Sequence, residues 1–172
     1  MIYRDPGDID EAMKAYEHVH AASWKISEPY PNFIRGLSRM CAELGWLRLG
    51  VVYAADQPVA AQLWIVDGRV ATIYKLVYDE RFARLSAGSI LTAHMMEHVM
   101  DVDKVQEIDY LTGDDSHKKY WMSDRRERWG IVAFNLRTPR GLIAATQHYA
   151  GKAIRGMFKG MQRAPTSDRP GG

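Results

Sequence analysis

The chain has 172 residues, of which 47% are hydrophobic, and these figures suit one domain with one sizeable core. Lysine and arginine number 23 against 21 aspartates and glutamates, so the net charge of +2 requires neither nucleic acid nor an acidic partner. The longest stretch without a charged residue is 85–96, whose 12 residues are too few for a membrane-spanning helix.

Cysteine content and the N-terminal sequence indicate the compartment. Cys41 is the single cysteine, which excludes an internal disulfide and a zinc site built from several cysteines. The first ten residues lack the apolar block of a secretory signal. We therefore expect a cytoplasmic protein without a transmembrane segment.

Helical patterns open the chain. Asp8 and Glu11 have the spacing of a capping box, and the apolar residues that follow predict a helix over 9–24. A second apolar stripe starts at Phe33 and stops at Gly45, which predicts a helix over 33–44. Cys41 lies on this stripe, and we interpret it as a core residue with no catalytic role.

From residue 47 the apolar period changes from 3.6 to 2, which is typical of strands. The runs 47–53 and 59–65 are joined through a short turn at 55–58. Asp67-Gly68 predicts a hairpin before a third strand over 69–78. The sequence thus predicts three neighbouring antiparallel strands.

The second half alternates shorter elements. Ser86 is expected to cap a helix that runs to about Asp101, and 105–111 is a predicted strand. A short helix, a last strand over 129–136 and a final helix from Pro139 follow, and 164–172 is predicted to be a disordered tail. We expect an α+β (mixed α/β) fold with a largely antiparallel mixed sheet and helices on both faces, as a single domain over 1–163.

Small residues and two cations stand where the third strand passes into its helix. Arg81 and Arg84 precede a run of small residues at 86–89, at a predicted helix N-terminus. Free backbone N–H groups and the positive end of the helix dipole favour a phosphate there. A capped helix with two solvated arginines is the alternative interpretation.

These motifs support a family resemblance over about residues 9–150. Tyr78-Asp79 with Arg84-Leu85-Ser86-Ala87-Gly88-Ser89, and later Gly113-Asp114 with Lys118 and Trp121, resemble the FemAB-like and CelD-like branch of the GCN5-related N-acetyltransferases. Members of the branch are about twice this length, and the chain resembles their C-terminal half.

The resemblance implies a GCN5-related acetyltransferase fold with acetyl-CoA or another acyl-CoA as donor and an amine or amino sugar as acceptor. It also implies a link to cell-envelope or exopolysaccharide synthesis. No metal and no nucleic acid are expected to take part. The residues expected to bind the donor are Leu76, Val77, Tyr78, Arg81, Arg84, Leu85, Ser86, Ala87, Gly88 and Ser89.

Three residues are candidates for the chemistry. Asp114 follows a predicted strand and is the preferred carboxylate for deprotonating the acceptor, with Asp115 and Asp109 as reserves. Lys118 could pair with Asp114 or hold an acidic group. Tyr120 could protonate the leaving thiolate, although aromatic packing is the interpretation that we favour for this residue.

The phosphate loop departs from the pattern of the wider superfamily. Ser86 replaces its first glycine, and Ala83 stands where a basic residue belongs. Two alternatives therefore stay open: an aminoacyltransferase that uses charged tRNA, and a non-catalytic half of a two-domain protein. A homodimer or a missing N-terminal half would complete such a site.

Two further motifs have competing interpretations. His94, Glu97 and His98 match the pattern of inverted zinc peptidases, but with Asp101 they also form the polar face of a helix, which we favour. Lys152, Arg155, Lys159 and Arg163 recur at helical spacing near the end of the chain. They could bind an anionic membrane or nucleic acid, or form a solvated face.

Overall fold

The computed structural model describes residues 1–26, 29–113, 115 and 118–161. Its contacts divide the chain into two compact units, Met1–Met122 and Ser123–Gly172. A single domain over 1–163 stays a prediction, and the predicted tail 164–172 lies outside the described residues.

The first unit contains the elements that the sequence predicts, in the same order. Strand β1 (Ile2–Tyr3) precedes helices α1 (Ile9–Ala21) and α2 (Pro31–Glu43), and strands β2 (Leu47–Ala54), β3 (Gln57–Asp67) and β4 (Val70–Tyr78) follow. A 3-10 turn, η2 (Glu80–Leu85), leads into α3 (Ala87–Asp101), β5 (Glu107–Asp109) and α4 (Lys118–Trp121). The two-residue β1 is too short for a periodic pattern, and the sequence did not indicate it.

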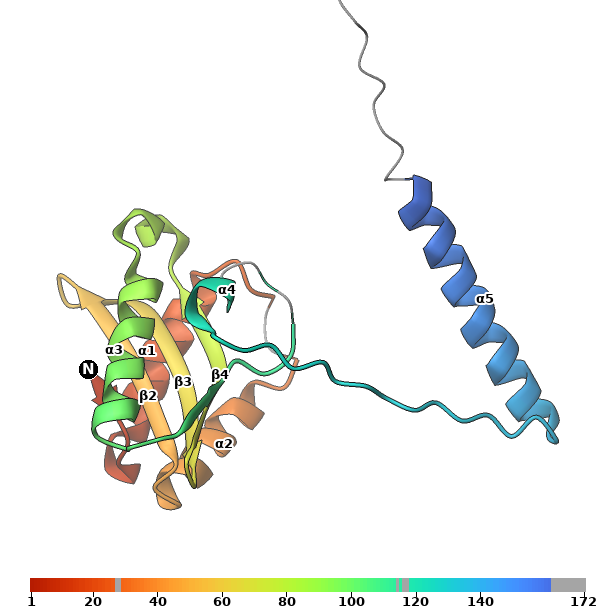
Figure 1. Cartoon of the computed structure of the whole chain (residues 1–172). Helices are drawn as coiled ribbons and strands as arrows, with labels where there is room; N and C mark the ends of the chain where they lie inside the picture. Colours follow the sequence, from red (N-terminus) through yellow and green to blue (C-terminus); the bar gives the residue numbers. More distant parts are fainter. Residues whose placement is uncertain (27–28, 114, 116–117, 162–172) are drawn as a thin grey trace, which may run out of the picture. The chain divides into compact units, whose positions relative to one another are not determined.

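The five strands form one mixed sheet in the order β1-β2-β3-β4-β5. The first three pairs are antiparallel and β4 pairs with β5 in parallel. Figure 1 shows α1 and α3 on opposite faces of this sheet. The predicted α+β class, the largely antiparallel sheet and the helices on both faces are therefore confirmed.

Each face of the sheet has its own apolar core. One contains side chains of α1, α2 and alternate residues of the strands, such as Leu49 and Leu63, and it includes the buried Cys41 as predicted. The other lies under α3 and includes Trp64, Leu91 and Met95. Both hairpins have the predicted tight turns: Gly68 has φ +59°, and Ala55 and Asp56 also have positive φ.

Halfway along β4, the side chains change the face of the sheet on which they lie. Leu63 pairs with Lys75 while Trp64 pairs with Ile73, which leaves Tyr74 as an extra residue in a β-bulge. Before the bulge Ile73 belongs to the core under α3, whereas after it Val77 belongs to the core under α1. The bulge therefore decides which face each residue at the end of β4 presents.

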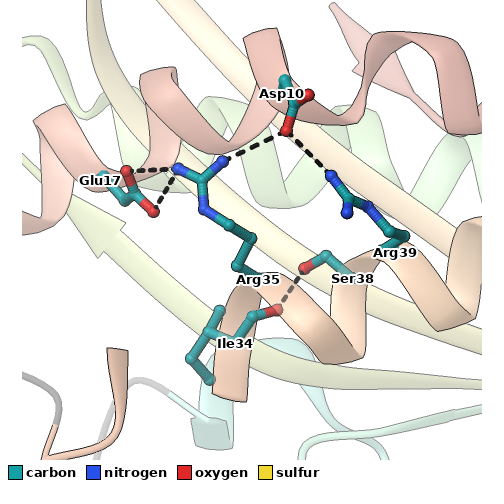
Figure 2. Close-up of polar contacts among 6 residues, drawn as sticks. All are labelled: Asp10, Glu17, Ile34, Arg35, Ser38 and Arg39. Atoms are coloured by element: carbon teal, nitrogen blue, oxygen red, sulfur yellow. Dashed lines mark hydrogen bonds and ion pairs between the residues drawn. The ribbon is translucent and has the colours of Figure 1, made fainter. Parts of the chain in front are cut away.

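Ion pairs on the surface connect α2 with α1 (Figure 2). Arg35 contacts Glu17 at 2.8 Å and Asp10 at 3.3 Å, and Arg39 also contacts Asp10 at 3.3 Å. Within α2, the buried Ser38 hydroxyl donates to the carbonyl of Ile34. Exposed pairs each contribute about 1 kcal/mol or less, so apolar packing dominates the docking of α2.

Both predicted side-chain caps are wrong. Asp8 ends a 3-10 turn (Pro6–Asp8) in helical conformation and makes no side-chain cap. Ser86 has φ +51° and also makes none, because a capping side chain requires extended backbone at that position. The helices nevertheless begin at the predicted places, since apolar packing determines them.

The second unit contains α5 (Pro139–Met161), which begins at the predicted proline. The predicted strand over 129–136 is wrong: the structure assigns no strand there, and Trp129, Ile131 and Leu136 are exposed. A strand needs a hydrogen-bonded neighbour, and among the described residues none pairs with this stretch. Phe134 instead packs against His148 and Tyr149 of α5, with ring centroids 5.5 and 6.4 Å away.

Candidate active site

The C-terminal part of β4 has an open edge. Parallel pairing with β5 covers only Val70, Ala71 and Thr72, and β4 continues to Tyr78 beyond them. Among the described residues no strand pairs with this side of 73–78. An open strand edge of this kind is where an extended ligand can form main-chain hydrogen bonds.

A turn after β5 causes the two strands to part. Leu111 has φ +57°, and its N–H donates to the Asp109 carboxylate at 2.7 Å. Lys118 reinforces the turn, because its ammonium donates to the carbonyls of Tyr110 and Thr112 at 3.1 and 2.8 Å. The chain thus leaves the sheet before it can cover the end of β4.

The N-terminus of α3 follows the end of β4 after the 3-10 turn η2. Ser86 N–H donates to the carbonyl of Ala83, and Ile90 N–H donates to that of Ser86. The N–H groups of Ala87, Gly88 and Ser89 lie between these two and belong to the first turn of α3, where N–H groups have no carbonyl within the helix to donate to. They are the amides predicted to bind an anion, at the start of a 15-residue helix.

A buried polar network attaches this first turn to the sheet. The Gln62 side chain is fully buried on β3, and its Nε2 donates to the Gly88 carbonyl at 3.0 Å and to Thr92 Oγ1 at 2.8 Å. Trp64 Nε1 donates to Gln62 Oε1 at 2.8 Å. The sequence analysis missed this network, although a glutamine within a run of apolar strand residues was a signal for it.

The two arginines predicted to face a phosphate have different surroundings. Arg81 donates through Nε and Nη2 to the buried Asp79 carboxylate, with a shortest distance of 2.6 Å. Hydrogen bonds from Arg81 lower the pKa of Asp79, with a smaller effect from His18, despite opposition from burial. Arg84 is exposed and makes no ion pair with the residues that the structure describes, so it is the freer cation.

Aromatic rings lie at the junction of β4 and α3. The rings of Trp24 and Tyr78 have centroids 4.5 Å apart. On its other side Tyr78 contacts the first turn of α3, since a Cβ added to Gly88 would lie 3.4 Å from the Tyr78 ring. The segment after α1 therefore reaches the site, which the sequence analysis did not foresee.

The predicted catalytic carboxylate, Asp114, lies outside the described residues. Of its reserves, Asp115 is exposed and lies 3.6 Å from Lys118, and Asp109 accepts the turn hydrogen bond from Leu111. Lys118 is only 17% exposed, and its hydrogen bonds support the turn at Tyr110 and Thr112. The structure thus gives Lys118 a structural role, and its predicted role in the reaction stays a prediction.

Two tyrosines follow the end of β5. Tyr120 in α4 is 88% exposed, so the favoured interpretation of aromatic packing does not describe it. Tyr110 is buried under α3, and burial raises its pKa to about 12, against a smaller opposite effect of Thr92. Tyr110 therefore keeps its proton at neutral pH, next to the network that supports α3.

The histidines of α3 do not converge. His94 Nδ1 lies 3.8 Å from Glu97, whereas His98 is mostly buried, with Nε2 3.9 Å from Asp103 of the buried Arg48–Asp103 pair. The predicted solvated polar face is thus wrong for His98. Within the described part of the chain no three potential metal ligands gather.

Comparisons with known proteins address the family and the fold of the chain. The family model described as an acetyltransferase (GNAT) domain matches residues 1–119. A search of curated proteins found no match.

Several solved structures share the fold. An aminoglycoside acetyltransferase from an uncultured soil metagenomic sample, bound to sisomicin, has a TM-score of 0.52 at 14% identity, covering 77% of this chain and 95% of that one. Glucosamine-6-phosphate N-acetyltransferase from Arabidopsis thaliana has a TM-score of 0.51 at 13% identity, covering 77% and 97%. A predicted acetyltransferase with acetyl-CoA from Clostridium acetobutylicum has 0.51 at 15%, covering 79% and 97%.

Proposed function

Because this chain belongs to the GNAT family of acetyltransferases, we propose that it transfers an acyl group, most simply acetyl, from CoA to an amine. The observation that carries the proposal is the open edge of β4 beside the first turn of α3. The amine class includes amino sugars, in keeping with the branch that the sequence resembles and with two of the solved neighbours.

The donor is bound by main-chain groups in this proposal. The amides of Ala87, Gly88 and Ser89 bind the diphosphate, and Arg84 adds a positive charge beside them. The backbone of Leu76, Val77 and Tyr78 binds the rest of the carrier along the open edge of β4. Arg81 contributes indirectly, since its contact with Asp79 shapes the turn between Tyr78 and η2.

Transfer requires a neutral amine, a stabilised oxyanion and a protonated leaving group. Backbone N–H groups near the end of β4 are suited to the oxyanion, because they are fixed by the sheet. We assign Asp114 to deprotonation of the acceptor, either directly or through a water, and Tyr120 to protonation of the thiolate. Trp24 offers an apolar wall at the end of β4 against which a sugar ring can stack.

Calorimetric titration with acetyl-CoA tests the donor site. Ser89 is exposed in the first turn of α3, where glutamate stabilises a helix but repels a diphosphate. We expect saturable binding by the parent chain, at least about tenfold weaker binding by Ser89→Glu, and a change of no more than about threefold for the neutral Ser89→Gln. If Ser89→Glu and Ser89→Gln bind acetyl-CoA equally well, with unchanged melting temperatures, the diphosphate does not bind at this turn.

Thiol release with a panel of amines and amino sugars tests the reaction. Asp114→Asn should lower turnover by about 100-fold or more with little loss of acetyl-CoA affinity, whereas Asp115→Asn serves as the matched control. If acetyl-CoA does not bind at all, charged tRNA is the next donor to assay. Absence of activity with both would support a non-catalytic half.

A further inference from the structure

The two units of the chain have opposite charge. Residues 1–122 contain 13 lysines and arginines against 18 aspartates and glutamates, a net charge of −5. Residues 123–172 contain 10 against 3, a net charge of +7. From residue 128 to residue 167 the sequence has seven basic residues and no acidic one. The small net charge of the whole chain therefore conceals a strongly basic C-terminal unit.

Helix α5 in this unit is amphipathic. It has 23 residues and is therefore about 35 Å long at 1.5 Å per residue. On a helical period, apolar residues occupy positions 142, 143, 149, 153, 157 and 161 along one arc, and His148, Lys152, Arg155 and Lys159 take positions on the opposite side.

The described part of the apolar arc is uncovered within its own unit. Leu142 and Ile143 are 54% and 57% exposed, and Tyr149 is also exposed. Phe134 contacts His148 and, at the edge of the arc, Tyr149, and Ala145 is buried, so the preceding segment packs along the side of the helix next to the arc. Three large apolar side chains near one end of a stable helix indicate an interaction surface.

The start of α5 is built to form without a partner. Asn135 accepts hydrogen bonds from Arg137 and Thr138, and the Thr138 hydroxyl accepts from Gly141. A Cβ on Gly141 would clash with the carbonyl oxygen of Asn135, so this close approach requires glycine. The apolar arc is thus presented by a well-defined helix start.

We propose that α5 lies on the surface of an anionic lipid bilayer, with its apolar arc at the acyl boundary and its basic side among the headgroups. Charge complementarity favours this partner, because an anionic bilayer offers negative headgroups to the basic side of the helix and an apolar interior to its apolar arc. Nucleic acid would leave the apolar arc in water. In the described residues no helix is long and apolar enough to cross a bilayer, so the proposed helix lies on the membrane.

Co-sedimentation of the full chain with vesicles tests the proposal. One set of vesicles contains only phosphatidylcholine, and the other contains phosphatidylcholine mixed with phosphatidylglycerol. We expect binding to the anionic vesicles, at least about tenfold weaker binding to the neutral ones, and weakening as salt is added.

Paired variants separate the apolar arc from the charge. Leu142→Gln combined with Ile143→Gln leaves the charge unchanged and should weaken binding to anionic vesicles at least about tenfold, because two apolar side chains no longer enter the bilayer. Ala144→Gln, exposed but outside the arc, should change it less than about twofold. Circular dichroism confirms that the helix is retained.

Three results would overturn the proposal. They are absence of binding to anionic vesicles, equal binding to both vesicle types, and unchanged binding of the Leu142→Gln/Ile143→Gln variant to anionic vesicles. Saturable binding of an oligonucleotide or self-association that the double variant abolishes, without vesicle binding, would assign the arc to those partners instead. Acetyl-CoA titration of the same variants is independent of these outcomes, since no α5 residue belongs to the proposed donor site.

Discussion

Asp79 is the residue on which the geometry of the site depends most. It is fully buried directly after β4, and its carboxylate accepts from the backbone N–H and the guanidinium of Arg81. Its own N–H donates to the carbonyl of Val59 on β3. One carboxylate therefore fixes the turn that separates the strand from the first turn of α3.

The lowered pKa of Asp79 predicts a pH-dependent contribution to stability. The charged form is favoured in the folded state, so the contribution is complete above the unfolded pKa of about 3.9 and is lost as pH falls through the lower folded value. Asp79→Asn should therefore have a lower free energy of unfolding than the parent chain at pH 7, and this gap between the two free energies should close as the pH becomes acidic.

Urea unfolding of both proteins between neutral and acidic pH measures this gap. The exposed Asp101→Asn provides the control, which should show no comparable dependence. A gap between Asp79→Asn and the parent chain that persists at low pH would contradict the assignment.

Gln62 predicts a second effect at the residue scale. Gln62→Leu removes the partner of the buried Trp64 Nε1 and two bonds to α3, at a cost of about 2 kcal/mol or more. Thermal unfolding should show a melting temperature lower by roughly 5 °C. Gln57→Leu, less buried on the same strand, is the matched control; an equal effect of both variants would show that the network contributes nothing.

Some of the residues at the site could be located from the sequence, and others could not. The run 84–89 was located correctly from small residues before a helix, because helix N-termini have a local signature. The Gln62 network was not anticipated, since it depends on which elements become neighbours. The Asp79–Arg81 contact is local, but the burial of Asp79 that makes it important was not recognised in the sequence. Arg81 and Arg84 were indistinguishable in the sequence, and only the buried carboxylate separates them.

At the scale of elements, α3 lies unusually close to the sheet. A Cβ added to Gly50 of β2 would lie 2.5 Å from Met95 Sδ and 2.9 Å from Leu91 Cδ1, both in buried side chains of α3. The missing side chain lets the helix approach β2 and so places its N-terminus beside β4.

Gly50→Ala should therefore destabilise the fold by about 1–3 kcal/mol through overpacking. Gly36→Ala is an instructive control, because Gly36 is exposed in α2 with no atom within 4 Å of the added Cβ. That variant should be stabilised by up to about 1 kcal/mol, since alanine favours helix. Denaturant unfolding measures the change in the free energy of unfolding for each variant. The same sign of this change for both variants would contradict the close packing of α3 against Gly50.

Elements with a strong period were predictable, whereas those defined by a partner were not. The first two helices and the three-strand meander follow from residues of alternating or helical spacing. The stretch 129–136 has apolar residues typical of a strand, yet it lies exposed because nothing described pairs with it. The bulge at Tyr74, which turns the end of β4, has no sequence signature that was recognised.

At the scale of the whole molecule, the chain combines an acidic GNAT unit with a basic helical one. Family and fold were recognisable from the motifs at 78–89 and 113–121. The opposite net charges of the two units were not predicted, because the boundary between the units is apparent only in the structure. The two proposals do not depend on each other, because the proposed donor site lies in the first unit and α5 in the second.

Amide resonances of Ala87, Gly88 and Ser89, followed by NMR during a titration with acetyl-CoA, test most directly whether α3 binds the donor. Hydrogen bonds to a diphosphate should move these three resonances downfield in a saturable way, among the largest changes in the spectrum. If acetyl-CoA binds saturably while these amides stay unchanged, or if it does not bind at all, the donor site does not lie at the start of α3.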